Sequence, residues 1–372
     1  MKHNFQKLVK LSFPSATIIL SLLLMVISSC KKEITQTGLE ESYSKVNKTL
    51  KDFKQVNLVG DNDEYSPARI DANLVNGWGI AISPNGFFWV SAEGTGTSVI
   101  YDQDGGEVRP PVSIPSPTSA SGGHPSGQVF NPTPDFVLSN GTKAFFIFAG
   151  LDGVISAWNP AAGNSAITVI NEPGDVYSGI AIAQDGGANF LYVAAFSEHK
   201  VEVYDGNFQE VEKPFIDPDI PTEYSPFNIQ NIGGKLYVMY AKFNEEEGEE
   251  ETGSGLGYVD IFNPDGSLVK RLVSKGQLNA PWGVAWAPAS FFGENGQSAI
   301  LIGNFGDGHI NAYSEDGHFL GQLRGHGKPI VIEGLWGISF PPATATSINP
   351  NRLYFAAGPD DEEEGLFGYI TK

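Results

Sequence analysis

One pattern, repeated six times, constrains the fold of this chain more than any other feature. Each repeat begins at a small or turn-forming residue, and the six starting positions are Gly79, Gly127, Gly179, Asn228, Gly283 and Gly337. An apolar strand follows in each, reading WVSA (89–92), FIFA (146–149), YVAA (192–195), YVMY (237–240), ILIG (300–303) and YFAA (354–357). A third strand ends at an aromatic residue, namely Tyr101, Trp158, Tyr204, Phe262, Tyr313 and Tyr369. These aromatic residues are on average about 54 residues apart, which suits a four-stranded blade plus its loops.

The repeats predict an all-β fold, a six-bladed β-propeller that spans residues 55–372. Apolar and other residues alternate in VEVYD (201–205) and VDIFN (259–263), as in strands with one buried face. The last repeat ends one strand short, after Gly368-Tyr369-Ile370. We expect residues 55–59, QVNLV, to supply the missing outer strand, because pairing the two chain ends closes the ring and removes an exposed sheet edge.

Glycine at the start of five of the six inner strands has a steric explanation. Inner strands crowd round the axis, and glycine permits a close backbone approach that other residues do not. Trp78, Trp282 and Trp336 directly precede three of these glycines. They pack between blades, or they form a ring of exposed aromatic side chains that stacks on a sugar or another ring.

The repeats also carry a family resemblance. The stretches NLVNGWGIA (73–81), FWVS (88–91), GTGTS (94–98), NAPWGVA (279–285) and GNFGDG (303–308) resemble an uncharacterised family of bacterial exported propeller proteins. The resemblance runs from about residue 57 to the C-terminus. More distantly, the repeats resemble NHL-repeat and gluconolactonase-like six-bladed propellers. The close resemblance implies the fold and no activity, and the distant one is an analogy of fold.

The N-terminal segment predicts a lipoprotein. Three lysines and an apolar run are followed by Ile27-Ser28-Ser29-Cys30, the pattern of a signal peptide (1–29) that is removed before a lipidated cysteine. Cys30 is the one cysteine of the chain. Residues 30–54 then form a polar, flexible tether. An uncleaved membrane anchor is the alternative. The expected localisation is extracytoplasmic, with the lipid in the outer membrane. If Lys31-Lys32-Glu33 is an export signal, the protein lies at the cell surface.

Charge and missing motifs exclude several functions. The formal net charge of −20 argues against a nucleic-acid partner, because phosphate contacts need a positive surface. The chain has no HExxH pair and no GxSxG nucleophile motif, so we assign no catalytic residue.

Two acidic runs, EEEGEEE (245–251) and DDEEE (360–364), each follow a second strand and should rise from the same face of the propeller. They are solvated hairpin loops, or they hold Ca²⁺ or another hard cation, which carboxylate oxygens suit. The residues six positions before the third-strand aromatics lie on that face too, and four of the six are acidic. The metal candidates are Asp152, Glu198, Asn304, Asp307 and Glu363.

The sequence favours a lipid-anchored binding or interaction module for an unknown protein, small molecule or glycan. Its expected ligand face carries Asn76, Trp78, Trp282 and Trp336. The alternative is a divalent-metal-dependent hydrolase or lyase of the lactonase type, in which the metal polarises a substrate carbonyl. Its ligand candidates are Asn76, Asp152, Asn279, Asn304 and Asp307. A scaffold without a small ligand is the third hypothesis.

Overall fold

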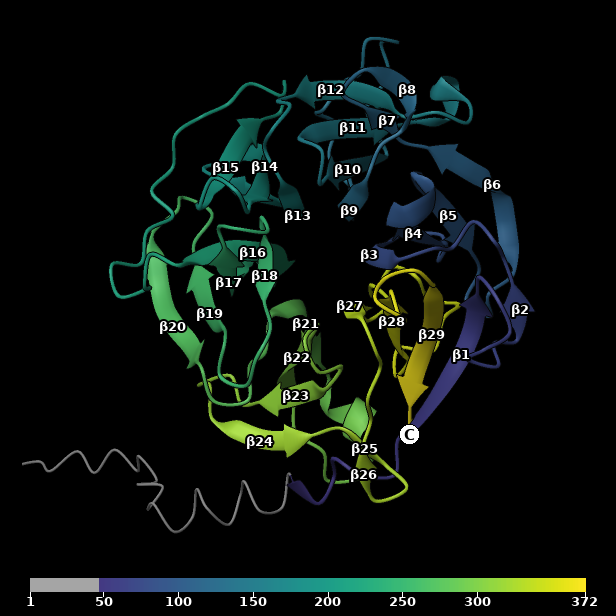
Figure 1. Ribbon diagram of the computed structural model, residues 1–372, viewed down its shortest axis with the longest axis vertical. Helices are drawn as coiled ribbons and strands as arrows, with labels where there is room; N and C mark the ends of the chain where they lie inside the picture. Colours follow the sequence, from purple (N-terminus) through teal and green to yellow (C-terminus); the bar gives the residue numbers. More distant parts are fainter. Residues whose placement is uncertain (1–46) are drawn as a thin grey trace, which may run out of the picture. The chain divides into compact units, whose positions relative to one another are not determined.

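The computed structural model describes residues 47–372, which form an all-β, six-bladed propeller around a central axis (Figure 1). The predicted signal peptide, Cys30 and the tether as far as residue 46 lie outside the described residues. Three 3₁₀ helices interrupt the strands: η1 (Glu93–Thr95), η2 (Pro160–Ala162) and η3 (Ala289–Phe292). Within residues 47–372, no helix is long and apolar enough to cross a membrane.

Blades 1 and 2 are four-stranded antiparallel sheets, and blade 3 is a three-stranded one. From axis to rim, blade 1 holds β3 (Gly77–Ile82), β4 (Phe88–Ala92), β5 (Thr97–Tyr101) and β6 (Glu107–Ser113). A hairpin of β7 (Pro115–Ser116) and β8 (Ser119–Gly122) follows it. Blade 2 holds β9 (Pro125–Phe130), β10 (Phe146–Gly150), β11 (Val154–Trp158) and β12 (Ile167–Asn171). Blade 3 holds β13 (Tyr177–Asp185), β14 (Ala188–Ala195) and β15 (Lys200–Asp205).

Blades 4 to 6 complete the ring. Blade 4 holds β16 (Tyr224–Ile232), β17 (Lys235–Asn244), β19 (Tyr258–Phe262) and β20 (Leu268–Ser274), and β18 (Glu249–Glu251) pairs with the far end of β17. Blade 5 holds β21 (Pro281–Ala287), β22 (Ala299–Asn304), β23 (Ile310–Tyr313) and β24 (Phe319–Gln322), and the hairpin of β25 (Arg324–Gly325) and β26 (Lys328–Pro329) follows. Blade 6 holds β27 (Leu335–Ser339), β28 (Leu353–Ala357), β29 (Leu366–Thr371), β1 (Lys54–Gly60) and β2 (Arg69–Ile70).

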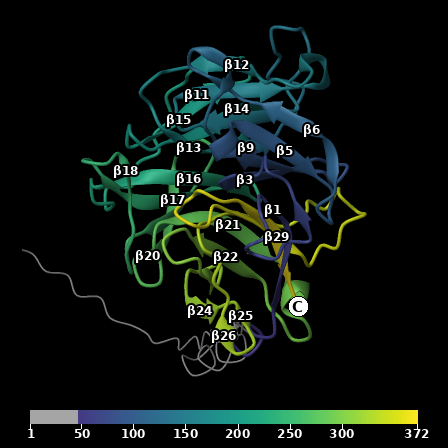
Figure 2. The same ribbon diagram turned by 45° about the vertical axis from the view of Figure 1, so that its right-hand side comes forward.

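The two ends of the propeller close the ring as predicted. β1 pairs antiparallel with β29, with Val56 opposite Tyr369 and Gly60 opposite Leu366. The two strands run side by side in both views (Figures 1 and 2). Residues 55–59 therefore do supply the outer strand that the last repeat lacks.

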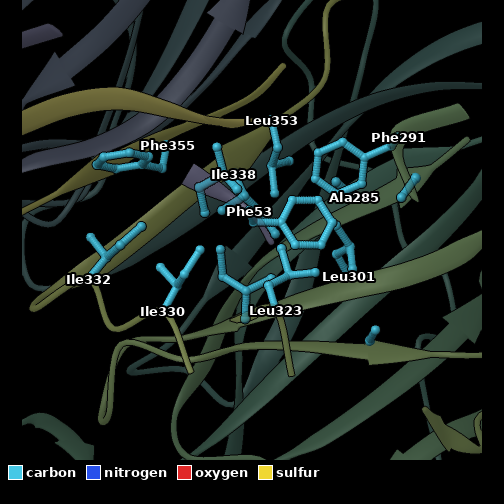
Figure 3. Packing of buried hydrophobic residues seen from close by; sticks show 14 of the residues in the cluster. Phe53, Ala285, Phe291, Leu301, Leu323, Ile330, Ile332, Ile338, Leu353 and Phe355 are labelled. Carbon is cyan, nitrogen blue, oxygen red and sulfur yellow. The ribbon is translucent and has the colours of Figure 1, made fainter. Parts of the chain in front are cut away.

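Residues 47–53, which the sequence assigns to the tether, belong to the folded domain. Leu50 and Phe53 are each 1% exposed and pack in the core between blades 5 and 6. Figure 3 shows Phe53 among Leu301, Leu323 and Leu353. Two apolar residues in a charge-rich segment give little periodicity, which is why the predicted domain boundary lies too late in the chain.

The fourth strand that the repeat length predicts is missing from blade 3. The segment after β15 contains Pro214, Pro218 and Pro221. Proline has no backbone N–H to donate to a ladder, so this segment does not continue as a strand.

Steric crowding at the axis is confirmed by the contacts of the inner glycines. A Cβ atom on Gly79 would lie 2.7 Å from the carbonyl oxygen of Ser126 in the next blade. On Gly337 it would lie 2.5 Å from the carbonyl oxygen of Trp78. The inner strands of neighbouring blades therefore touch through their backbones, and any side chain at these positions would push the blades apart.

Candidate functional site

The axis has two ends with different chemistry. We call upper the face that carries the loops between second and third strands, and lower the face where the inner strands end. Each inner strand runs from the upper to the lower face, so its first residues lie near the upper end of the axis.

Three tryptophans fill the upper end of the axis. Trp78, Trp282 and Trp336 are only 4%, 4% and 1% exposed. Trp78 stacks on Trp336 with ring centroids 3.4 Å apart, and Trp282 meets both rings edge-on at 5.8 and 5.9 Å. Phe305 stacks on the other side of Trp336 at 4.0 Å. We call these four residues the aromatic plug. Of the two alternatives for these tryptophans, the structure shows the packed one and not an exposed stacking ring, because the rings bury one another.

Asn76 joins the aromatic plug to the upper-face loops. It is 2% exposed and has a φ of 50°, a left-handed conformation that asparagine tolerates better than most residues. Its side-chain oxygen accepts a hydrogen bond from the Trp336 indole at 3.2 Å. Its amide donates to Glu93 at 2.9 Å and to Glu362 at 2.6 Å. The expected ligand residue Asn76 is therefore fully occupied inside the protein.

The two acidic runs rise from the upper face and approach each other. Burial raises the pKa of Glu362 from its usual 4.5 to about 7, the hydrogen bond from Asn76 lowers it, and the charges of Glu93 and Glu249 raise it. Burial likewise raises the pKa of Glu250 to about 8, and the charge of Glu362 acts in the same direction. His124 lies 2.6 Å from Glu93 and provides a positive charge at this end when protonated.

Glu362 makes the stability of the protein depend on pH. A carboxyl whose pKa is raised by folding binds more protons in the folded than in the unfolded state between pH 4.5 and about 7, so stability falls as pH rises through this window. We expect Glu362→Gln to be more stable than the wild type at pH 8, with a free energy of unfolding about 1–2 kcal/mol larger after allowing for partial exposure. At pH 4, where Glu362 is largely protonated in both states, the two proteins should be equally stable. Urea denaturation at both pH values measures this. An equal difference at both would contradict it.

The five metal candidates are spread over blades 2, 3, 5 and 6. Asn304 donates a hydrogen bond to Asp307 at 3.0 Å, and these two are the pair that the structure brings together. Glu198 and Glu363 are exposed, whereas burial raises the pKa of Asp152. In the alternative set, the Asn279 side chain accepts a hydrogen bond from the backbone of Gly253 at 2.6 Å. Among residues 47–372, no three His, Cys, Asp or Glu residues are arranged as metal ligands.

The lower end of the axis is open. A cavity of about 480 Å³ lies between the ends of the inner strands, and we call it the axial funnel. Its apolar wall comes from isoleucine, alanine, valine, phenylalanine and proline side chains, including Ile80, Ile82, Phe130, Ile180, Ile182 and Phe340. Its polar groups are the side chains of Gln128, Gln230, Asn231 and Ser339. No charged side chain lines it.

The ring of glycines sits between the funnel and the aromatic plug. A hollow of only about 20 Å³ is lined by Gly79, Gly127, Gly283 and Gly337, and Trp282 forms part of its wall. The axis therefore narrows from a ligand-sized cavity to a space for little more than one water, and it ends at the buried tryptophans.

Sequence reasoning missed the funnel because it located function on the loops. A signal was present in the inner strands, where Gly79-Ile80-Ala81-Ile82 and Gly179-Ile180-Ala181-Ile182 place isoleucines one and three positions after the ring glycine. Alternate residues of a strand share a face, so these isoleucines lie on one face of their strands, where they pack between neighbouring blades and also line the funnel. Glu93 was missed on the upper face because η1 shifts the loop, and the position six residues before Tyr101 is Thr95 instead.

Comparison with known proteins finds viral relatives. The chain is 34% identical over 333 residues to the uncharacterised protein R648 of Acanthamoeba polyphaga mimivirus, and the alignment covers 86% of this chain and 80% of R648. It is 34% identical over 335 residues to the uncharacterised protein L690 of the same virus, covering 86% of each. No protein-family model matches the chain. These viral relatives do not support the bacterial exported family that the repeats resemble.

Similar solved structures include virginiamycin B lyase from Staphylococcus aureus, with a TM-score of 0.49 and 12% identity, covering 86% of this chain and 99% of that chain. A streptogramin B lyase structure gives a TM-score of 0.46 and 14% identity over 86% of this chain and 97% of that chain. Similarity at this level says nothing about the reaction or ligand of this chain.

Proposed function

The chain belongs to the family of the mimivirus proteins R648 and L690, and from the geometry of its axis we propose that it is a ligand-binding propeller. The binding site is the axial funnel. Its ligand is a small, uncharged molecule that combines apolar groups with hydroxyl or amide groups.

The observation that carries this proposal is the chemistry of the funnel wall. The whole chain has a formal net charge of −20, yet the funnel is lined by apolar side chains, three carboxamides and one serine. Binding sites for small molecules are concave and mostly apolar, with a few polar groups and volumes of about 300–1,000 Å³. The funnel, at about 480 Å³, has this size, and apolar and polar groups make up about equal parts of its wall.

Blocking the funnel tests the proposal. We expect a panel of uncharged aryl glycosides and N-acyl amides, screened by ligand-observed NMR, to contain binders. Ile182→Trp fills the funnel and should weaken them at least tenfold, because the indole occupies the space of the ligand. Ile167→Trp is the matched control, since Ile167 is equally half-buried but lies on the outer strand of blade 2. Binders that lose affinity equally in both variants, or a panel without binders, would contradict the funnel as the site.

We also propose that Cys30 carries a lipid that anchors the protein to a membrane, with the outer membrane as the expected one. The support is the sequence alone, in which Cys30 follows an apolar run and two serines. Labelled palmitate should enter the wild type and not Cys30→Ser during expression in a bacterial host. Equal labelling of both chains would refute the anchor.

A further inference from the structure

A second cavity lies between blades 1 and 2 on the lower face. Its volume is about 350 Å³, and most of its wall is apolar. The turn between β3 and β4 lines it, together with residues at the ends of β9 and β11. It adjoins the axial funnel, since Phe130 lines both. We call it the aromatic cavity, after its aromatic lining residues Phe87, Trp89, Phe130, Phe145, Phe146 and Trp158.

Three of these rings belong to the core between the two blades. Trp89, Phe146 and Trp158 are 3%, 3% and 5% exposed. Trp89 stacks on Phe146 with ring centroids 3.9 Å apart, and its centroid lies 4.8 Å from that of Trp158. The indole of Trp158 donates a hydrogen bond to the carbonyl oxygen of Gly163 at 2.9 Å. These contacts hold the rings in place, so a ligand would meet aromatic surfaces that are already formed.

Of the described residues that line the aromatic cavity, one is charged, and it is Arg109. Its guanidinium carbon lies 4.4 Å from the ring centroid of Trp158 and 5.9 Å from that of Trp89. Nη2 donates to the carbonyl oxygen of Gly163 at 3.0 Å and to the side-chain oxygen of Asn164 at 2.9 Å. Nε and Nη1 have no acceptor within residues 47–372. Because a guanidinium group stays charged in proteins, these free donors suit an anion.

A register shift in blade 1 places Arg109 on the cavity side of its strand. Tyr101 of β5 pairs with Glu107 of β6, whereas the preceding residue, Ile100, pairs with Arg109, so β6 carries one extra residue here. Residues directly opposite each other in a ladder share a face. Ile100 lines the cavity, and Tyr101 packs in the core shared with blade 6. The one carboxylate of β6 therefore lies on the opposite face from the guanidinium group.

Arg109 differs from the other half-buried arginines because it lacks a carboxylate partner. Arg271 pairs with two aspartates, and Arg352 pairs with Asp104 at 2.9 Å. Among the described residues, no carboxylate pairs with Arg109 or lines the cavity. Burial accordingly lowers the pKa of Arg109. In a chain with 43 acidic and 23 basic residues, this half-buried charge leaves room for an anion from outside the protein.

We propose that the aromatic cavity binds a small aromatic carboxylate, a planar molecule of one or two rings. The ring packs against Trp89, Phe146 and Trp158 by stacked or edge-on contacts. The carboxylate accepts hydrogen bonds from the free donors of Arg109, and such charged hydrogen bonds are among the strong ones. A volume of about 350 Å³ lies within the range of small-molecule sites, about 300–1,000 Å³. This site does not depend on the axial funnel, whose proposed ligand is uncharged.

An NMR titration of the full chain with 2-naphthoate tests the proposal. We expect saturable binding with a dissociation constant below about 1 mM. Arg109→Gln should weaken it at least tenfold, because the substitution removes the charge and keeps a polar side chain. The matched control is Arg69→Gln, which makes the same change of charge at an exposed residue of β2 and should bind like the wild type. Circular dichroism verifies that both variants are folded.

A neutral probe separates recognition of the charge from apolar contact alone. 2-Naphthamide has the shape of 2-naphthoate without its charge, and it should bind at least tenfold more weakly. Both probes are compared in Ile182→Trp, in which the axial funnel is filled, and 2-naphthoate should bind this variant like the wild type. The proposal is overturned if 2-naphthoate does not bind, if Ile182→Trp abolishes its binding, or if the amide binds equally well there. Equal losses in the Arg109 and Arg69 variants would also overturn it.

Discussion

Trp336→Ala is expected to lower the free energy of unfolding by about 3–5 kcal/mol, the usual cost of removing a fully buried tryptophan. Trp336 lies at the centre of the aromatic plug, where it is stacked between Trp78 and Phe305 and met edge-on by Trp282. Its removal leaves a cavity that the ring of rigid inner strands cannot collapse to fill. It also removes the indole hydrogen bond that holds Asn76.

The chain offers a matched control for this experiment. Trp286 is 44% exposed and makes one hydrogen bond, to Glu315 at 3.2 Å. Trp286→Ala should cost less than about 1 kcal/mol. The comparison comes from urea denaturation of both variants, monitored by far-ultraviolet circular dichroism of the backbone because the substitutions change tryptophan fluorescence. If the two variants lost equal stability, the aromatic plug would not be the structural centre of the upper face.

Val59→Asp is expected to destabilise the propeller by at least about 3 kcal/mol, because it places an unpaired charge in a buried site. Val59 is 1% exposed and lies opposite Phe367 in the ladder between β1 and β29. Detaching β1 would expose the edge of β29, and an exposed edge favours association between chains. We therefore expect both a lower urea midpoint and a larger oligomeric fraction in size-exclusion chromatography.

Val108→Asp provides the control for the closing strand. Val108 lies on β6, the outer strand of blade 1, and is 38% exposed. The same substitution there should change stability by no more than about 0.5 kcal/mol and leave the protein in its wild-type oligomeric state. A wild-type midpoint and elution volume for Val59→Asp would mean that the ring stays closed without β1.

The sequence predicted the parts of the fold that repeat. Glycines recur at equivalent positions in five of the six blades and apolar strands recur at regular spacing in all six, and the missing last strand made β1 the natural partner of β29. Features that occur once were not predictable in this way. Phe53 docks on blades 5 and 6 within a polar segment, and Lys213 anchors the segment after β15 to Asp185. Each depends on a single tertiary contact that leaves no periodic signal.

The candidate site was harder to predict than the fold, for a related reason. The sequence puts Trp78, Trp282 and Trp336 at the starts of inner strands, but it could not show that three rings from three blades bury one another. Their mutual burial closes the upper end of the axis. The funnel at the opposite end is made of Ile80 and similar residues, which look in the sequence like ordinary core residues.

The pairing of β1 with β29 constrains the order in which the protein can be built. Lys54 pairs with Thr371, so almost the whole propeller separates the two partners along the chain. β1 comes before all other strands in the chain and has no partner until residues 366–371 have been made. Blades 1 to 5, in contrast, are each formed by strands that follow one another in the chain. Blade 6 is therefore the last blade to assemble, and β1 has no strand to pair with until residues 366–371 are available.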